Sequence, residues 1–186
     1  ASAAGILINI ESFREVAELA EISRATDCRP RVAVRVNPDF ELKSSGMKMG
    51  GGPKQFGIDA ESVPETLKRI GELGIHFEGF HIFSGSQNLK AESIMEAHQK
   101  TFELARRLND TVPSPIRTLN IGGGFGIPYF PGETRLNVTQ VGDNLAQLLP
   151  AVKPWLGDAA IVIELGRYLV GEAGIYVSRV VDKKIS

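Results

Sequence analysis

Cysteine is almost absent from this sequence, since Cys28 is the only one among 186 residues. No disulfide can form within the chain and no cysteine-thiolate metal cluster can be built, so we expect a protein of the reducing cytoplasm. The formal net charge of −1 predicts no electrostatic attraction to nucleic acid or to an anionic membrane. No apolar run approaches the roughly 20 residues of a membrane-spanning helix, and no signal-peptide pattern is present.

Several short catalytic motifs are also missing. The sequence has no Gly-x-Ser-x-Gly nucleophile elbow, no P-loop and no Gly-x-Gly-x-x-Gly after its first expected strand. One histidine and one glutamate on neighbouring strands are too few for a closed metal site, so no metal is expected. A Ser-His-acid triad through Ser84 or Ser86 remains conceivable from the residues alone.

What the sequence does contain is a regular alternation of apolar strands and amphipathic helices. The length suits one domain with a substantial core. We expect strands at 5–10, 31–36, 77–82, 116–121 and 160–164, and a half-solvated strand at 175–184. Helices are expected from Ser12, which opens a capping box with Glu15, and at 60–72, 91–109 and 138–152. This order predicts an α/β fold of parallel βαβ units, either a (β/α) barrel or an open doubly wound sheet.

Residues capable of chemistry fall at the carboxyl ends of the expected strands. They are Arg35, His81, the glycines 122–124 and Glu164. That end of the strands carries the active site in barrels and in open α/β sheets. Each residue also has a structural interpretation: Arg35 as a salt-bridged rim residue, His81 as a satisfied core histidine, and Glu164 as a carboxylate paired with a nearby donor.

Three consecutive glycines, Gly122, Gly123 and Gly124, follow the fourth expected strand. Glycine backbone can wrap an anion closely because it reaches positive φ and carries no Cβ. The same residues also make plain tight turns. His76 and His98 are expected to be surface or helix residues and are assigned no role. An anion cradle beside an aromatic histidine, a carboxylate and an arginine suits a planar, phosphorylated, nitrogen-containing ring.

Four ordered motifs resemble those of the alanine-racemase-fold, pyridoxal-phosphate (PLP) dependent decarboxylases, which act on diaminopimelate, ornithine and arginine. The motifs are the segments 55–58, 81–87, 120–126 and 164–168. Segments 47–52 and 124–130 are similar to a subgroup that includes exosortase-associated decarboxylases and decarboxylases of carrier-protein-bound amino acids. The resemblance implies a PLP-binding (β/α)8 TIM-like barrel of the alanine racemase N-terminal type, present here incompletely.

The resemblance also implies roles for individual residues. His81 would stack on the cofactor ring, and Ser84 would lie near its phosphate. The N–H groups of Gly122, Gly123 and Gly124 would hold that phosphate, together with the turn at Gly166 and Arg167. Arg167 would alternatively meet a substrate carboxylate, and Arg35 would lie near the ring hydroxyl.

Glu164 carries the mechanistic implication of the resemblance. A carboxylate beside the pyridine nitrogen keeps the ring protonated and therefore strongly electron-withdrawing. Racemases of this fold use arginine there, so glutamate favours decarboxylation. Two residues depart from the family pattern: Leu165 replaces a proline, and Phe83 replaces a glycine and is expected to reshape the pocket.

The resemblance implies that parts of the whole protein lie outside this chain. The Schiff-base lysine is expected on an upstream barrel strand, and a C-terminal β-domain is expected to complete the site across a homodimer. Residues 1–174 would be the central and C-terminal part of the barrel, and 175–186 a strand leading toward that domain. The excerpt alone is expected to be inactive.

Two alternatives remain: a non-catalytic PLP-binding barrel, and a phosphate-binding TIM-barrel lyase or isomerase without PLP. The sequence does not distinguish which amino acid is decarboxylated, nor whether it is free or carrier-bound.

Overall fold

The chain forms a layered α/β structure in a computed structural model that describes residues 1–40, 47–48 and 54–185. The main sheet is parallel, with the order β1-β2-β5-β7-β8 and with β4 paired to β2. Its strands are β1 (Leu7–Ile10), β2 (Arg31–Asn37), β4 (Ile58–Asp59), β5 (His76–Ile82), β7 (Thr118–Gly123) and β8 (Ala160–Glu164). A separate antiparallel pair joins β3 (Met47–Lys48) to β6 (Gly85–Ser86).

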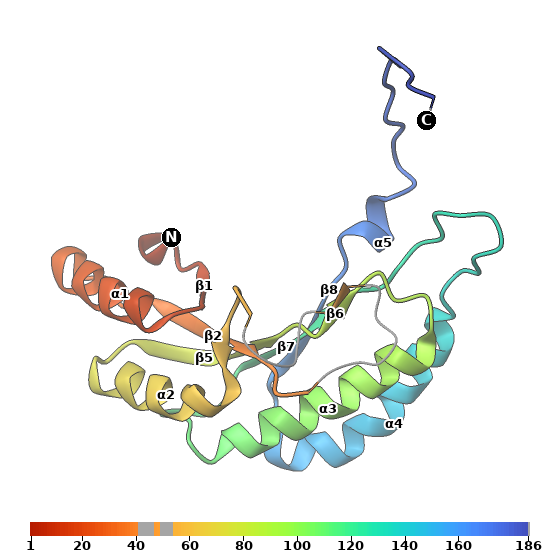
Figure 1. The fold of residues 1–186 in the computed structure, drawn as a ribbon. Coiled ribbons are helices and arrows are strands. Elements are labelled where there is room, and N and C mark those ends of the chain that lie inside the picture. The colour runs from red at the N-terminus through yellow and green to blue at the C-terminus, as the bar shows by residue number, and fades with distance from the viewer. Residues whose placement is uncertain (41–46, 49–53, 186) are drawn as a thin grey trace.

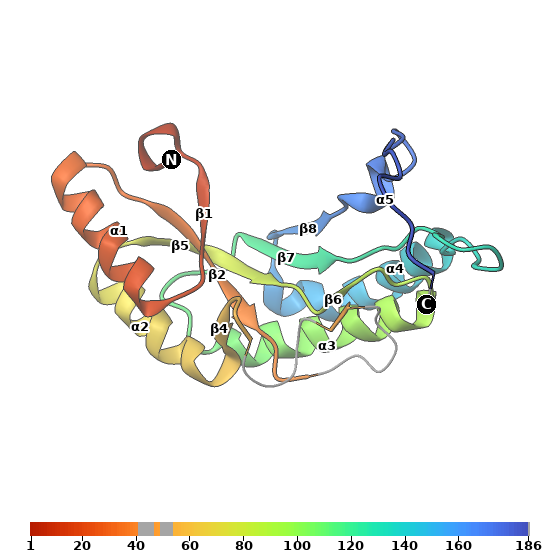
Figure 2. The ribbon, with the colours of Figure 1, turned by 45° about the horizontal axis from the view of Figure 1, so that its top comes forward.

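The helices lie on one face of this sheet (Figures 1 and 2). They are α1 (Phe13–Thr26), α2 (Val63–Glu72), α3 (Ala91–Asn109) and α4 (Val138–Leu156). A short helix, α5 (Arg167–Val170), follows the last strand and is not part of this layer (Figure 1). Single 3-10 turns, η1 (Ser2–Ala4) and η2 (Ala60–Ser62), precede β1 and α2. The main strands follow one another in chain order, whereas a doubly wound sheet reverses its order and carries helices on both faces. The strand order and the single layer of helices confirm the predicted barrel type, of which this chain forms an incomplete part.

Local sequence explains where the helices begin and end. The predicted capping box is present: the Ser12 side chain accepts from the Glu15 N–H, and the Glu15 carboxylate accepts from the Ser12 N–H. Gly74, just past α2, takes a φ of +66°, which suits glycine at a helix end. Helix α3 has the predicted bounds. Helix α4 continues four residues beyond the predicted end, to Leu156, although Pro150 and Pro154 lie inside it.

The larger of two hydrophobic clusters among the described residues lies between the sheet and its helices. The fully buried side chains include Phe77 and Phe80 of β5, whose rings meet edge to face with centroids 5.3 Å apart. Leu67 and Ile70 from α2 and Leu104 from α3 pack into the same core. The interior is therefore on the helical side, and the strand ends that carry the predicted functional residues project beyond it.

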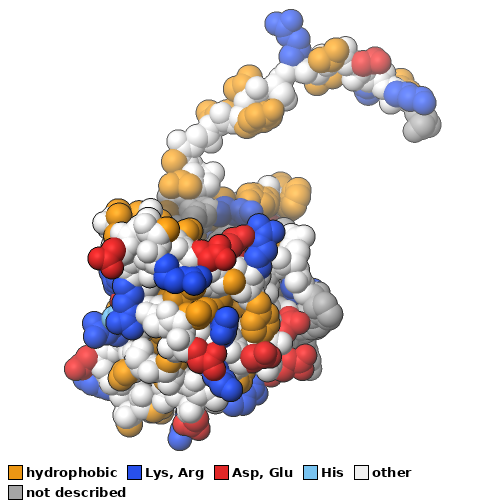
Figure 3. All heavy atoms as spheres, turned by 90° about the vertical axis from the view of Figure 1, so that its left-hand side faces the viewer, with side chains coloured by type: hydrophobic (Ala, Val, Ile, Leu, Met, Phe, Trp, Pro, Cys, Tyr) orange, Lys and Arg blue, Asp and Glu red, His pale blue; other side chains and the backbone are white. Residues whose placement is uncertain are grey.

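The structure differs from the sequence-based expectation at the end of β7 and in the tail. Strand β7 runs to Gly123, two residues past its predicted end, so Gly122 and Gly123 belong to the strand. Residues 175–184 form no strand; they stand clear of the body with exposed apolar side chains such as Ile175 and Tyr176 (Figures 1 and 3). A strand needs a hydrogen-bonded neighbour, and none of the described strands lies beside this segment. Its place in a second domain stays a prediction.

His98 was expected to be a surface or helix residue, and the structure makes it a helix residue. His98 lies in α3 with only 2% of its surface exposed. Most of the segment 47–52, which carried part of the subgroup resemblance, lies outside the described residues. In the part of the chain that is described, no helix combines the length and apolar character needed to cross a membrane.

Candidate active site at the carboxyl ends of the strands

Three polar residues, Arg35, His81 and Asn120, form one row across the sheet. Arg35 of β2 pairs in register with His81 of β5, and His81 pairs with Asn120 of β7. The register between β7 and β8 then shifts after Asn120, so that Gly123 lies opposite Glu164. Parallel pairing thus brings residues from four segments of the chain to one edge, as the strand-end rule predicted.

His81 is buried, with 6% of its surface exposed. Its Nε2 lies 3.3 Å from Oε2 of Glu164. Burial lowers the pKa of His81 below its ordinary value, and the positive charge of Arg35 acts in the same direction, while Glu164 and Glu11 oppose it. We take the lowering as the net direction because burial is the largest contribution. His81 Nδ1 meets no hydrogen-bond partner among the described residues.

Glu164 ends β8 with about half of its side chain exposed. Besides His81, it contacts Asn120, whose Nδ2 donates to Glu164 Oε1 at 2.7 Å. The Oδ1 of Asn120 accepts from the Gly122 N–H at 2.9 Å. The donor that Glu164 was expected to need is therefore Asn120, a residue to which the sequence argument gave no role of its own.

Arg35 forms a salt bridge with Glu11, which directly follows β1. Arg35 Nη1 lies 2.7 Å from Glu11 Oε1, and the Gly57 N–H donates to the other carboxylate oxygen at 3.0 Å. The Arg35 guanidinium also lies over the Phe56 ring, 5.0 Å from its centroid. The salt-bridged interpretation of Arg35 is thus present in the structure. Glu11 was missed, although it too lies at a strand end, where the same rule would have found it.

Arg167 opens α5 and is held by Gln87. Arg167 Nη1 donates to Gln87 Oε1 at 3.0 Å, and Gln87 Nε2 donates to the backbone oxygen of Ile127 at 2.6 Å. Gln87 adopts a φ of +56°, which is unusual for a residue other than glycine. The Arg167 guanidinium lies 5.6 Å from the centroid of the Tyr129 ring. One glutamine therefore links the loops that follow β6, β7 and β8.

A cavity of about 390 Å³ joins several of these groups. Its lining includes Glu164, Gly124, Gly166 and Arg167, all predicted site residues, together with Phe83, whose effect on the shape of the cofactor pocket stays a prediction. Ser86 lines this cavity and Ser84 does not. The phosphate contact expected of Ser84 stays a prediction, and Ser86 is a second serine close to the same glycines.

The glycines are required by close backbone packing. A Cβ on Gly123 would lie 1.8 Å from the Glu164 carbonyl oxygen, and one on Gly124 would lie 2.0 Å from that of Gly85. Gly122 and Gly124 also have φ values of +75° and +76°. The Gly122 N–H is taken by Asn120, whereas the Gly124 N–H donates to no described residue. Of the predicted phosphate donors, Gly124 is thus available and Gly122 is not.

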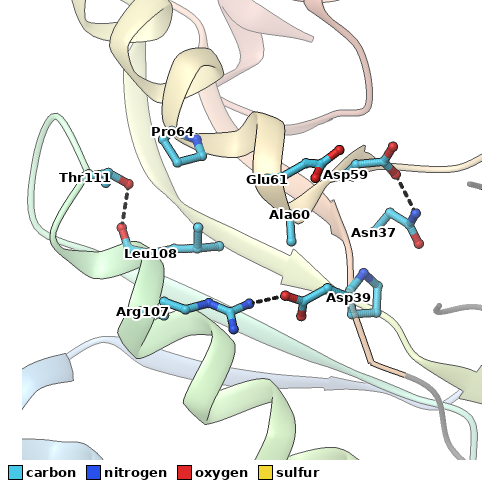
Figure 4. Close-up of a pocket in the computed structure, with 10 residues that line it drawn as sticks. Asn37, Asp39, Asp59, Ala60, Glu61, Pro64, Arg107, Leu108 and Thr111 are labelled. Atoms are coloured by element: carbon cyan, nitrogen blue, oxygen red, sulfur yellow. Dashed lines mark hydrogen bonds and ion pairs between the residues drawn. The ribbon is translucent and has the colours of Figure 1, made fainter. Parts of the chain in front are cut away.

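A second cavity, of about 450 Å³, lies between α2 and α3 (Figure 4). It holds none of the predicted site residues. Its polar side chains pair among themselves: Arg107 with Asp39 at 2.5 Å and Asn37 with Asp59 at 2.6 Å. The smaller cavity is therefore the candidate functional site. Within the described residues, no group of three or more histidine, cysteine or acidic side chains is arranged to hold a metal ion.

Comparison with known proteins agrees with this geometry. Residues 1–171 match the family model described as "Pyridoxal-dependent decarboxylase, pyridoxal binding domain". The chain is 33% identical over 178 residues to L-glutamyl-[BtrI acyl-carrier protein] decarboxylase of Niallia circulans, covering 95% of this chain and 42% of that protein. It is 34% identical over 179 residues to diaminopimelate decarboxylase of Thermoplasma acidophilum, covering 96% and 42%.

A solved structure shows the same fold. Diaminopimelate decarboxylase from M. jannaschii, in co-complex with L-lysine, superposes with a TM-score of 0.75 at 25% identity. The match covers 90% of this chain and 39% of that one, so the chain spans about two fifths of the length of its relatives. The chain belongs to the pyridoxal-dependent decarboxylase family, and residues 1–171 lie in its pyridoxal-binding domain.

Proposed function

We propose that the full-length protein decarboxylates an amino acid with PLP, and that this chain supplies the phosphate and ring-nitrogen contacts. The observation that carries the proposal is the half-exposed Glu164 carboxylate, held by Asn120 at the edge of a cavity that also contains Gly124 and Arg167. The family match supports the cofactor, and the 33% and 34% identical relatives, both decarboxylases, support the reaction.

The residues present fit the cofactor. Glu164 offers an acceptor for a protonated ring nitrogen, and the Gly124 N–H offers a donor to phosphate. His81 has a flat ring and an Nδ1 that meets no described partner. The cavity volume lies within the range of about 300–1,000 Å³ typical of small-ligand sites.

When bound, PLP supplies a conjugated ring that withdraws electrons from the substrate carbon losing CO2. The chain's own residues make that withdrawal effective. Glu164 would hold a proton at the ring nitrogen, and His81 would keep the ring in place by stacking. Gly124, Gly166 and Ser86 or Ser84 would bind phosphate. Arg167, fixed by Gln87, would orient phosphate or a substrate carboxylate. Gly122 and Gly123 would shape the turn, and Arg35, paired with Glu11, would border the ring edge.

The substrate class and the assembly also belong to this proposal. One relative acts on glutamate carried by an acyl-carrier protein and another on free diaminopimelate, so both free and carrier-bound amino acids should be assayed. We propose a cytoplasmic homodimer, supported by the single free cysteine and by the family resemblance.

The test uses the full-length protein with added PLP. Visible absorbance of bound cofactor and CO2 release from at least one amino acid, free or carrier-bound, are expected. Binding of PLP without CO2 release from any substrate would favour a non-catalytic barrel. Affinity for phosphate but not for PLP would favour the phosphate-binding lyase or isomerase, and affinity for neither would overturn the placement of the site.

A further inference from the structure

Asn120 connects the two halves of the site. It lies within β7, three residues before the end of the strand at Gly123, with 9% of its surface exposed. Its Nδ2 donates to Glu164 Oε1 at 2.7 Å, and its Oδ1 accepts from the Gly122 N–H at 2.9 Å. One short side chain therefore touches both the carboxylate and the glycine turn.

The chemistry of the two partners fixes the orientation of the Asn120 amide. An ionised carboxylate can only accept hydrogen bonds, and a backbone N–H can only donate. The amide must therefore point its NH2 group at Glu164 and its oxygen at Gly122. Aspartate could replace only the second of these contacts, because it has no donor when ionised.

Glu164 needs such a support. Its side chain is about half exposed, and its only other described polar contact is with His81, at 3.3 Å. A carboxylate at a strand end with one aligned donor has other rotamers open to it once that donor is removed. The Asn120 contact is the shorter of the two, and it comes from the neighbouring strand, which is rigidly placed by the sheet.

Gly122 depends on the same residue from the other side. Its φ is +75°, and its N–H would otherwise face the buried end of β7 unpaired. By accepting this hydrogen bond, Asn120 fixes the first peptide of the turn that leads to the available N–H of Gly124.

We propose that Asn120 is a positioning residue that sets the Glu164 carboxylate and the Gly122 turn in a single geometry. The inference rests on the proposed function for its kinetic consequences, but its structural part concerns this chain alone. If Asn120 contributed only to folding, Asn120→Asp and Asn120→Ala would both lower stability. They would not have different effects on the Glu164 contact and the Gly122 contact.

Asn120→Asp in the full-length protein tests the Glu164 contact. The variant keeps an acceptor for Gly122 but sets a second carboxylate against Glu164, so we expect kcat to fall about 10- to 100-fold at neutral pH. At lower pH the two carboxyl groups would share a proton, and the protonated aspartate would again donate to Glu164. The deficit relative to wild type should therefore shrink as the pH falls.

Asn120→Ala tests the Gly122 contact without cofactor. Hydrogen exchange of the Gly122 amide should be at least about tenfold faster in Asn120→Ala than in wild type, and close to wild type in Asn120→Asp. The affinity of the unloaded protein for inorganic phosphate should fall in Asn120→Ala and stay within about twofold in Asn120→Asp, since only Asn120→Ala loosens the turn.

Asn137→Asp is the matched control. Asn137 is an exposed N-cap of α4, whose Oδ1 accepts from the Gln140 N–H, and aspartate caps equally well. It should behave as wild type in all three assays. A pH-independent deficit in Asn120→Asp, or unchanged Gly122 exchange in Asn120→Ala, would overturn the inference. If wild type itself neither binds PLP nor releases CO2, the proposed function fails, while the exchange assay still decides the Gly122 contact.

Discussion

His81 and His98 are both buried, and burial lowers the pKa of both, yet their surroundings differ. His81 lies at the carboxyl end of β5 with Glu164 3.3 Å away and Arg35 and Asn120 on the adjacent strands. His98 lies within α3, where burial alone lowers its pKa to about 4, and its Nδ1 meets no partner among the described residues. Burial of a titratable group is therefore not enough to mark a site. What distinguishes His81 is that the sheet places charged side chains, Glu164 and Arg35, beside it.

The largest expected effect comes from removing the carboxylate that sets His81 apart. Glu164→Gln in the full-length protein should lower kcat by about 10²- to 10³-fold, because glutamine cannot hold the ring nitrogen protonated. PLP binding, followed by absorbance, should persist. Glu172→Gln, which removes an exposed partner of Arg135, is the matched control and should keep full activity. Full activity in Glu164→Gln would contradict the role of this carboxylate. The charged surroundings of His81 would then not mark a functional site.

The next effect concerns His98 and stability. Its folded pKa, about 4, lies below the ordinary value of 6.5, so the unfolded chain binds the proton first as the pH falls. The free energy of unfolding should decline between about pH 6.5 and pH 4 by up to about 3 kcal/mol from this group, and not further below.

His98→Leu should remove that part of the pH dependence and leave activity at neutral pH unchanged. Urea unfolding of both proteins at several pH values measures the difference. Equal slopes against pH in wild type and His98→Leu would contradict the assignment.

A smaller effect separates the shape of His81 from its charge. His81→Ala should weaken PLP binding about tenfold, because a stacked ring contributes about 1 kcal/mol or slightly more. His81→Phe keeps a flat ring and should bind within a few-fold of wild type. Titration of the apoprotein with PLP measures both, and equal losses in the two variants would argue against stacking.

The smallest effect is expected at the third histidine. His76 is about one-third exposed and lies 3.2 Å from the buried Glu78, which Arg31 also contacts at 2.7 Å. Because Arg31 remains, His76→Gln should change the free energy of unfolding by less than about 0.5 kcal/mol and leave activity unchanged. A larger loss of unfolding free energy, measured by heat or urea, would show that His76 contributes to stability as a buried residue does.

Much of the fold could be predicted because its strands and helices alternate regularly and each depends on local sequence. Strand β8 and helix α3 have the predicted bounds, and the capping box at Ser12 is present, since each depends on residues close in the chain. The end of β7 and the tail 175–184 could not be placed, because strand length depends on which neighbour is available for pairing.

The positions of the candidate site residues at the strand ends could be predicted, whereas the contacts between them could not. His81 and Glu164 were chosen because each lies at a strand end, and parallel pairing brought them together. The bridge through Asn120 and the pairing of Arg35 with Glu11 depend on register and rotamers, which no local pattern encodes. The same holds for the presence of Ser86 in the cavity lining.

The packing of Gly123 and Gly124 has a consequence for how relatives of this protein can diverge. Any side chain at either position would collide with the backbone of Glu164 or Gly85, whether or not a cofactor is ever bound. A relative without decarboxylase activity would therefore still need these glycines for folding. The side chain at position 164 is half exposed and is under no such backbone constraint, so a change of chemistry among relatives should appear there before it appears at the glycines.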